Sequence, residues 1–453
     1  MRIVNCEIIQ YAYKRAFLCK QVRRGELILA LLIKNGYVLD PGTGTEGIMD
    51  VYIEDGIIQE IKANLNGSAR EIIDATGLYV MPGFIDLHTH LREPGFEYKE
   101  TIETGSEAAA RGGFTTICAM PNTNPVIDNR KMVEAIVEKA KKEAIVHVLP
   151  IGAVTKGQKG QELADIKDMA KAGAVAISED GKSVMNAALY RQGMIQAREA
   201  GIPVFAHCED KDLAGQGVLN EGEKSRELGL PGICNAVEDI IVARDILLAK
   251  DTQVKLHLCH CSTRDSVTFI KLAKEKGLTV TGEVCPHHFT LADEDIKKVD
   301  ANYKMNPPLR SREDILVLKE GLKNNTIDVI ATDHAPHSKE EKEKSIREAP
   351  FGIVGLETAF ALTMTELVLK NWMTPMQMVE KLSLNPAKIL GIDKGILVPG
   401  KAADITIADP KEEYRINMEE FASRGKNTPF HGKLVTGRIK YTIVDGKVVY
   451  RHK

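Results

Sequence analysis

Histidines and aspartates that could hold metal ions recur along the middle of the chain, each at or just beyond the end of an expected strand. His88 and His90 form a His-Thr-His pair, and side chains two residues apart in extended chain point to the same side. Both imidazoles can therefore reach one ion. Four imidazoles and two carboxylates suit Zn²⁺ or a similar borderline cation. The six candidate ligands are His88, His90, Asp180, His207, His260 and Asp333.

Six ligands with Asp180 as a bridge fit a two-metal site. Such a site lowers the pKa of bound water and yields hydroxide near neutral pH. A lone histidine at a strand end is more often packed or hydrogen-bonded than a metal ligand. Coincidence is a poor explanation for six candidates that follow five different strands. The sequence therefore predicts a hydrolytic centre with one or two zinc ions, two being favoured.

A second set of polar residues suits an anionic substrate. Arg92 lies two residues beyond His90, and a guanidinium binds a carboxylate in bidentate fashion. Singly these residues have ordinary explanations, since Asn in Pro-rich turns usually stabilises the turn. Beside a metal centre they predict a carboxylate pocket. Its members are Arg92, Asn122, Asn306 and His337.

The remaining histidines and cysteines are weaker candidates. His147 and His257 lie within expected strands and are interpreted as core or surface residues. His334 is expected to support a ligand rather than to be one, and His287 and His288 stay unassigned. Cysteine thiolates bind zinc well, but Cys259 and Cys261 alternate away from His260 in an extended chain. They are predicted to be packing residues.

Eight candidate strands alternate with helices through this region. That number favours a (β/α)8 TIM barrel, whose active site lies at the carboxyl ends of the strands. A doubly wound sheet is the alternative. Helices are expected at 129–142, 236–249 and 264–276. The expected strands are 83–88, 114–119, 145–151, 174–178, 202–207, 254–259, 278–284 and 326–332.

Strand patterns at both ends of the chain predict a second, smaller domain. Two apolar runs turn at Asp55-Gly56, and a matching pair turns at Asp445-Gly446, which is a strong hairpin signal. Further strands are expected at 27–33 and 401–408. We predict a small β-sandwich domain built from residues 31–82 and 392–453, a barrel over 83–391 and an N-terminal extension over 1–30.

Composition excludes several classes of protein. The 453 residues carry 60 basic and 63 acidic side chains, a net charge of −3 that disfavours a dedicated nucleic-acid binder. A hydrophobic content of 43% excludes wholesale disorder. No stretch approaches the roughly 18 apolar residues of a membrane helix. The eight cysteines have no framework spacing, which predicts reduced thiols in the cytoplasm.

Several motifs resemble those of a known family. Val80–His90 and Gly395–Ile405 look like the signatures of the amidohydrolase superfamily. Within it, four motifs closely resemble class I dihydroorotases, and the resemblance covers about residues 31–450. These motifs are His88–Gly95, Met120–Pro125, Asn306–Arg310 and Ala331–His337.

The resemblance implies reversible hydrolysis of L-dihydroorotate to N-carbamoyl-L-aspartate, a step of de novo pyrimidine biosynthesis, by a hydroxide that bridges the metals. His88, His90, Asp180 and Asp333 resemble ligands of one metal, and Asp180, His207 and His260 those of the second. Asp333 would also be the catalytic residue that carries the proton. Arg92, Asn122, Asn306 and His337 match substrate-binding positions. A loop over roughly 338–352, with Phe351 and Gly352, would close over the substrate.

One departure and several alternatives stay open. The family commonly has Asp where Glu179 stands here. Hydantoinases, dihydropyrimidinases and allantoinases usually bridge their metals with a carboxylated Lys, and residues 173–181 contain none. A cyclic amidase of hydantoin or allantoin type is nevertheless one alternative. A non-catalytic structural partner of aspartate transcarbamoylase is another, and a metal-free binding barrel a third. Family analogy implies a homodimer or a complex with aspartate transcarbamoylase.

Overall fold

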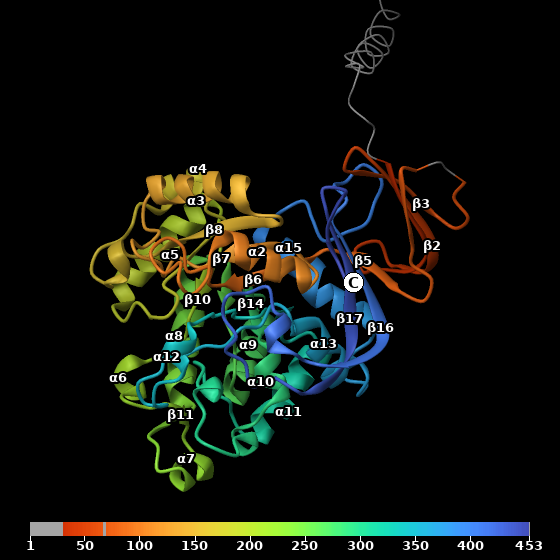
Figure 1. Cartoon of the computed structure of the whole chain (residues 1–453). Coiled ribbons are helices and arrows are strands. Elements are labelled where there is room, and N and C mark those ends of the chain that lie inside the picture. The colour runs from red at the N-terminus through yellow and green to blue at the C-terminus, as the bar shows by residue number, and fades with distance from the viewer. Residues whose placement is uncertain (1–29, 67–68, 453) are drawn as a thin grey trace, which may run out of the picture.

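Eight parallel strands pair in the order in which they occur along the chain and form a barrel (Figure 1). The structure, a computed structural model, describes residues 30–66 and 69–452. A single bridge between Thr89 and His334 links the two edges. The barrel strands are β6 (Phe84–Thr89), β7 (Phe114–Ala119), β8 (His147–Ala153), β9 (Ala176–Ser178), β10 (Val204–Ala206), β13 (Leu256–Leu258), β14 (Val280–Val284) and β15 (Val329–Ile330).

Each of the eight predicted strands is confirmed, with ends that differ by up to three residues. Strands of a parallel barrel are buried on both faces and read as nearly continuous apolar runs. Every residue of β6 and β7 is buried, including the polar Asp86 and His88. A polar residue inside such a strand therefore has a specific partner, and Asp86 accepts hydrogen bonds from the backbone of His88 and from Thr332.

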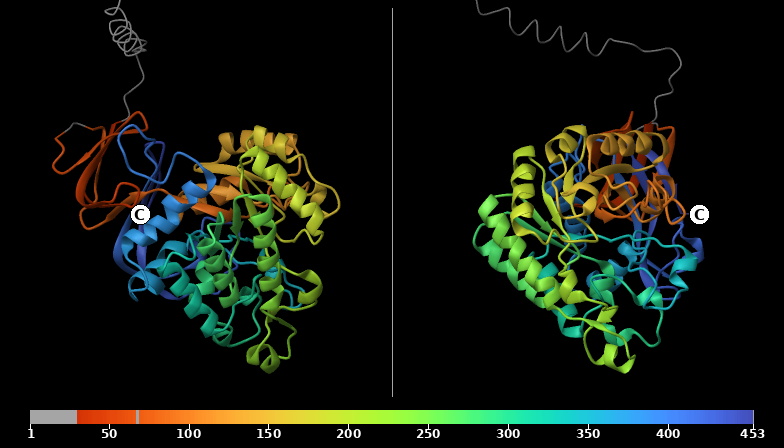
Figure 2. Two further views of the ribbon diagram at one scale, coloured as in Figure 1. Left: turned by 180° about the vertical axis from the view of Figure 1, so that it is seen from behind. Right: turned by 90° about the vertical axis from the view of Figure 1, so that its left-hand side faces the viewer.

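Helices cover the outside of the barrel (Figure 2). The three predicted helices are confirmed as α3, α8 and α9, and side-chain caps from Asn129 and Thr263 fix the starts of α3 and α9. The larger helices are α2 (Ile102–Arg111), α3 (Arg130–Glu143), α4 (Ile166–Ala172), α5 (Ala187–Ala200), α8 (Ala236–Thr252), α9 (Arg264–Glu275) and α11 (Arg312–Lys323). The shorter ones are α6 (Lys211–Ala214), α7 (Glu223–Glu227), α10 (Pro286–Thr290), α12 (Lys339–Lys342), α13 (Ala359–Thr363), α14 (Pro375–Val379) and α15 (Asn385–Leu390).

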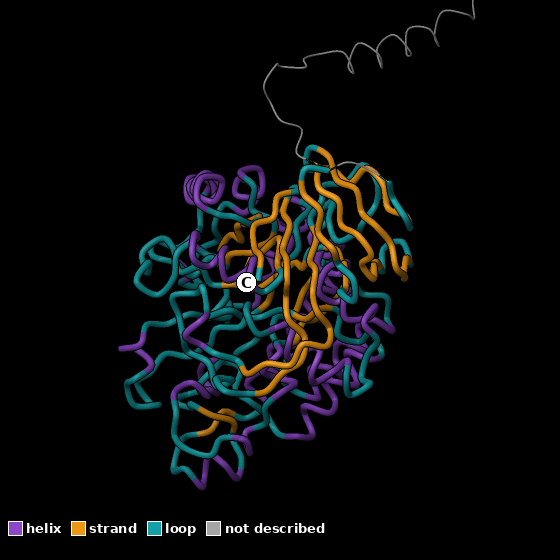
Figure 3. The backbone as a smooth tube through the Cα atoms, turned by 45° about the vertical axis from the view of Figure 1, so that its right-hand side comes forward, coloured by secondary structure: helices purple, strands orange, loops and turns teal. Residues whose placement is uncertain are grey.

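A second sheet, whose strands lie side by side in Figure 3, is assembled from both ends of the described chain, red and blue in Figure 1. Its central joint is the antiparallel pairing of β5 with β16, which places Val80 beside Ile407. Both predicted hairpins are present, and Gly56 and Gly446 meet at their turns. The strands are β1 (Ala30–Asp40), β2 (Thr45–Glu54), β3 (Ile57–Lys62), β4 (Glu71–Asp74), β5 (Tyr79–Pro82), β16 (Ile405–Arg415), β17 (Leu434–Val444) and β18 (Lys447–Arg451).

The eight strands of the second domain belong to one hydrogen-bonded sheet that bends around a single apolar core. Ile53 and Ile58 from its N-terminal half share that core with Ile405 and Ile443 from its C-terminal half. The strand expected at 401–408 begins only at Ile405, because residues before it turn to meet β3. The predicted strand at 27–33 lies partly outside the described residues. The predicted N-terminal extension, residues 1–30, lies almost wholly outside them.

Between β16 and β17 the chain leaves the sheet and runs to the barrel. We call residues 416–433 the strap. It contains a short turn of helix, η6 (Met418–Glu420), and then contacts segments that follow β6 and β15. A short β11 (Leu219–Asn220) and β12 (Gly232–Ile233) pair elsewhere in the molecule. Among the described helices, none is long and apolar enough to cross a membrane.

Candidate active site

All six predicted metal ligands converge at the carboxyl ends of the barrel strands. Asp180 lies at their centre: its Oδ1 is 3.1 Å from His88 Nε2 and 3.5 Å from His207 Nδ1. Its Oδ2 is 3.4 Å from His90 Nε2. One carboxylate therefore faces ligands that come from opposite sides of the barrel mouth, as the predicted bridging role requires.

The other ligands form two groups around Asp180. Asp333 Oδ1 lies 3.1 Å from His90 Nε2 and 3.5 Å from His88 Nε2. On the other side, His207 Nδ1 lies 2.9 Å from His260 Nε2. The two groups match the two ligand sets that the sequence resemblance implies.

The backbone around three site residues is strained. Arg92, His260 and Asp333 have φ values of 60°, 35° and 47°, in the left-handed region that side chains other than glycine seldom adopt. Each such residue costs of order 1–3 kcal/mol and persists where the surroundings fix it. Each follows a barrel strand, so these turns aim the side chains at the centre of the mouth.

Buried partners fix the orientation of the ligand imidazoles. His88 Nδ1 lies 2.8 Å from Glu283 Oε1, and Glu283 also contacts His257 Nε2 at 3.0 Å. Burial alone would raise the pKa of Glu283, but hydrogen bonds from His257 and His88 hold it well below its usual value. An ionised carboxylate only accepts, so His88 Nδ1 carries a proton and its Nε2 faces the centre, where it would bind a cation after losing its own proton.

Two more ligands are held in the same way. His90 Nδ1 lies 2.9 Å from Asn122 Oδ1, and His207 Nε2 lies 3.3 Å from Glu209 Oε2. A histidine that binds a metal almost always has its second nitrogen held by such a partner. Asn122, predicted from the sequence as a substrate contact, thus also supports a ligand, and it donates to Asp180 Oδ2 at 3.2 Å.

The donor set fits a divalent cation. Among the described residues, the buried His88 Nε2 and Asp180 Oδ1 have no well-aligned hydrogen-bond partner, although they lie 3.1 Å from each other at the centre. Burial and the charges of His207 and His88 lower the pKa of His260 to about 3, so its imidazole is neutral and can donate a lone pair. Burial would raise the pKa of Asp180, but His88 and His90 keep it well below its usual value. Burial would lower the pKa of His88 and of His207, but Asp180 raises both above the usual value, that of His207 to about 9, so a cation would displace a proton from each of these imidazoles on binding.

A cavity of about 350 Å³ opens directly above these ligands. That volume suits a small cyclic substrate. All six residues predicted as substrate contacts line the cavity: Arg92, Asn122, Asn306, His337, Phe351 and Gly352.

One wall of the cavity is cationic because it contains the guanidinium of Arg92, beside His337. Arg92 Nη2 lies 3.3 Å from His337 Nε2, and Arg92 Nε donates to the carbonyl of Pro336. Burial and the charges of Arg92 and Lys99 hold the pKa of His337 well below its usual value. His337 Nε2 lies 2.8 Å from the carbonyl of Phe351, so that nitrogen carries the proton. This wall combines a fixed cation with a neutral imidazole.

Three residues near the proposed metal ligands, Glu179, Lys182 and His334, have partners outside the centre. Glu179, the departure from the family pattern, accepts hydrogen bonds from the backbone of Val154 and Thr155 and faces away from the ligands. Lys182 bonds to the carbonyl of Gln158 rather than entering the centre. His334 contacts Glu100 and the backbone of Gly355 with its two ring nitrogens, so its ring supports neighbouring segments.

Cys259 and Cys261 are buried, and burial raises the pKa of both thiols. Cys259 nevertheless lies near the centre, since its sulfur is within 4.8 Å of one donor atom each of His88 and Glu283. His287 and His288 are buried on α10 and do not line the cavity.

Sequence reasoning missed Glu283 and Glu209. Glu283 stands in a buried strand between Gly282 and Val284, and an acid inside an apolar run was the available signal. Glu209 lies two residues after His207, and its Oε1 also accepts from Asn306 Nδ2 at 3.0 Å. It therefore links a metal ligand to a predicted substrate contact.

Replacing Glu283 by Gln is expected to weaken metal binding by about 10- to 100-fold, because loss of a supporting carboxylate usually has that effect. The amide cannot accept from His88, His257 and the backbone of His260 as the carboxylate does. Metal retention against a chelator series measures the change. Glu275→Gln, an exposed position on α9, is the control. Equal chelator midpoints for Glu283→Gln and wild type would contradict this role.

Comparison with known proteins agrees with this geometry. A family model described as "Dihydro-orotase-like" matches residues 77–266. A protein of Acetivibrio thermocellus named dihydroorotase is 51% identical over 423 residues, which cover 93% of this chain and 99% of the relative. A dihydroorotase of Pelotomaculum thermopropionicum is 52% identical over 425 residues, covering 94% and 99%.

Solved structures show the same fold. The L-hydantoinase of Arthrobacter aurescens superposes with a TM-score of 0.84 at 28% identity, covering 93% of this chain and 96% of that one. The dihydropyrimidinase of Brevibacillus agri superposes with a TM-score of 0.82 at 27% identity, covering 93% and 95%. These structural neighbours are cyclic amidases by name, in agreement with the barrel and its site.

Proposed function

The chain belongs to the dihydroorotase family, and from this membership and the site we propose that it interconverts L-dihydroorotate and N-carbamoyl-L-aspartate. The observation that carries the proposal is the pairing of a ligand cluster centred on Asp180 with a cationic wall at Arg92, in one cavity. The cluster suits hydrolysis of an amide, and the wall suits the ring carboxylate of dihydroorotate.

The metal would be held by two ligand groups that share Asp180. We propose two zinc ions, one held by His88, His90 and Asp333 and the other by His207 and His260. When bound, such ions activate water and polarise the carbonyl that is attacked. The His/Asp donor set and the unpartnered His88 Nε2 support this assignment.

Asp333 is the proposed carrier of the proton. Burial would raise its pKa, but the charge of His88 and the hydrogen bond from His90 hold it well below its usual value. It is therefore ionised and lines the cavity, so it can accept a proton from the attacking water. As the ring C–N bond breaks, the same carboxyl returns the proton to the leaving nitrogen. The products are a carboxylate and the terminal amino group of the carbamoyl unit.

Arg92, Asn122 and His337 are proposed to hold the ring carboxylate and orient the ring, and Asn306, which also lines the cavity, adds an amide. Fixed orientation lowers the barrier because less freedom is lost in the transition state. Phe351 and Gly352 would cover the substrate. In the reverse direction the reacting carboxyl must be protonated, so ring closure is favoured at lower pH.

Replacing Arg92 by Ala is expected to lower kcat/KM for dihydroorotate by about 100-fold or more. Two charge-assisted hydrogen bonds to a carboxylate are worth roughly 3 kcal/mol. Initial rates at subsaturating substrate measure the effect, with Arg130→Ala, an exposed position on α3, as the control. Unaltered turnover in Arg92→Ala would favour a substrate without the ring carboxylate, of hydantoin or allantoin type.

The test of the function is ultraviolet loss of dihydroorotate on zinc-loaded protein, with dihydrouracil, hydantoin and allantoin in parallel. Rapid turnover of dihydroorotate alone is the expected result. No turnover of any of them, with zinc bound, would instead support a structural role beside aspartate transcarbamoylase, to be tested by adding that enzyme. We further propose that the protein is cytoplasmic, and the six described cysteines form no disulfide. We also propose that it is a homodimer, which light scattering of the purified chain can test.

A further inference from the structure

The substrate side of the cavity depends on a segment that comes from the other domain. His337 and Gly352, two proposed substrate contacts, lie on stretches of chain 15 residues apart. An asparagine of the strap, Asn427, joins them. Its Oδ1 accepts from the backbone N–H of His337 at 3.0 Å. Its Nδ2 donates to the carbonyls of Ala335 at 3.0 Å and Gly352 at 3.1 Å.

These bonds use the whole side-chain amide. An asparagine has one carbonyl and two N–H donors, and all three find a partner here. The side chain is buried, with the residue 4% exposed, and the backbone carbonyl of Asn427 also accepts from Val354 N at 3.0 Å. An aspartate would set a carboxylate against two carbonyls, and a leucine would remove all three hydrogen bonds, leaving the Gly352 carbonyl with its bond from Lys342 Nζ alone. Asparagine is therefore the side chain that this position fits.

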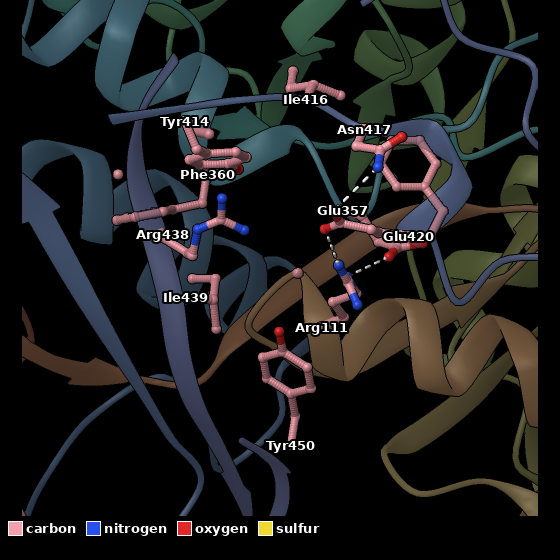
Figure 4. Close-up of a pocket in the computed structure, with 14 residues that line it drawn as sticks. Arg111, Glu357, Phe360, Tyr414, Ile416, Asn417, Glu420, Arg438, Ile439 and Tyr450 are labelled. Carbon is pink, nitrogen blue, oxygen red and sulfur yellow. Dashed lines mark hydrogen bonds and ion pairs between the residues drawn. The ribbon is translucent and has the colours of Figure 1, made fainter. Parts of the chain in front are cut away.

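The strap is itself fixed to the barrel, so Asn427 is held in a defined place. Glu357 accepts hydrogen bonds from the backbone of Ala422 and Ser423 at 3.0 and 3.1 Å. Arg111 at the end of α2 lies between the carboxylates of Glu357 and Glu420, at 3.0 and 3.2 Å (Figure 4). The strap thus begins on an ion-paired anchor before it turns toward the cavity.

A second anchor lies nearer the cavity. Glu100 accepts from Ser423 Oγ and from the backbone of Arg424, and it also contacts His334 Nε2 at 3.2 Å. The next residue, Gly425, passes so close to Pro336 that an added Cβ would lie 2.6 Å from the Cβ of that proline. Contact therefore continues from the anchors to the residue that precedes His337.

We propose that Asn427 is a positioning residue. It fixes His337 and Gly352 relative to each other, on the side of the cavity that would bind the substrate carboxylate. The inference rests on the proposed function, because that function makes His337 a substrate contact. Within the described part of the chain, the Asn427 side chain bonds to Ala335, His337 and Gly352, none of which is a proposed metal ligand. Its loss should therefore weaken binding of a carboxylate-bearing ring and leave the chemical step largely intact.

The experiment compares wild type with Asn427→Leu, which is close in volume but has no polar atoms. Asn417→Leu is the matched control, since Asn417 lies in the same strap and its side chain bonds only to Glu420 and the backbone of Glu419. The expected result for Asn427→Leu is a KM for dihydroorotate raised about 10- to 100-fold, the scale of two buried hydrogen bonds. We expect kcat within about threefold and unchanged metal content. Calorimetric affinity for orotate, an unreactive ring with the same carboxylate, should fall in parallel.

A second variant guards against misfolding of the first. In Gly425→Ala the added Cβ would lie 2.6 Å from the Cβ of Pro336 and 2.8 Å from Asn427 Oδ1, so the variant displaces the amide without removing it. It should raise KM and weaken orotate binding in the same direction, by a smaller factor. Melting temperature and metal content are measured for every variant.

The outcomes separate the two proposals. Active wild type with unchanged KM and orotate affinity in both variants would overturn the role of Asn427 alone. A fall in kcat together with loss of metal would also overturn it, because that is what a general structural role produces. Wild type that neither binds orotate nor hydrolyses dihydroorotate would overturn the proposed function and the role of Asn427 with it.

Discussion

Replacing Asp180 by Ala is expected to remove metal from both halves of the site and to lower kcat by at least about 10⁴-fold. This carboxylate is the one group that faces His88, His90 and His207 together, at 3.1, 3.4 and 3.5 Å. Without it, the imidazoles of the two ligand groups share no anion. Metal content by mass spectrometry and initial rates on dihydroorotate measure the two effects.

The neighbouring acid provides a sharp control for that experiment. Glu179 is buried beside Asp180 but bonds to the backbone of Val154 and Thr155. Glu179→Gln should therefore keep its metal, even if stability falls. An Asp180→Ala protein that still holds two metals per chain and reacts within tenfold of wild type would refute the bridging role.

Replacing Asp333 by Asn is the second large effect, with kcat expected to fall on the order of 10³- to 10⁴-fold, the usual contribution of a proton-transfer group. The amide keeps the shape of the side chain but cannot take up the proton. Because Arg92 and His337 are untouched, orotate affinity should stay within a few-fold of wild type. His207 and His260 should keep the metal on their side.

Rates, orotate affinity and metal content must all be measured, because Asp333 also contacts His88 and His90. Asp393→Asn, an exposed aspartate paired with Lys401, is the control. If Asp333→Asn retained metal and its kcat stayed within tenfold of wild type, another residue would have to carry the proton.

The convergence of the six proposed ligands was predictable because its signals are local. A histidine or aspartate that follows an apolar strand is visible in a short stretch of sequence, and the barrel brings all strand ends to one face. Thus Asp180 and His260 could be named as candidates without knowledge of their partners. The strained backbone of His260 and the shared position of Asp180 could not be predicted, because both arise only when distant strands meet.

The supporting residues were harder to predict for the same reason. Glu283 is one acid among many until the structure sets it against His88 and His257. Asn427 lies 90 residues beyond His337 in the chain, with no pattern that points to the cavity. The second sheet was predicted from its hairpins, but hairpin signals do not predict the strap, which leaves that sheet.

The pairing of β5 with β16 also has a consequence for synthesis of the protein. The first half of the small sheet leaves the ribosome before the barrel, and its partner strand β16 comes only after it. Contacts so far apart in sequence form slowly. Until β16 is synthesised, the early strands therefore have an unpaired edge, which can pair with another chain and lead to aggregation. The strap follows later still, so a nascent chain can complete its barrel and ligand cluster while its substrate wall is unfinished.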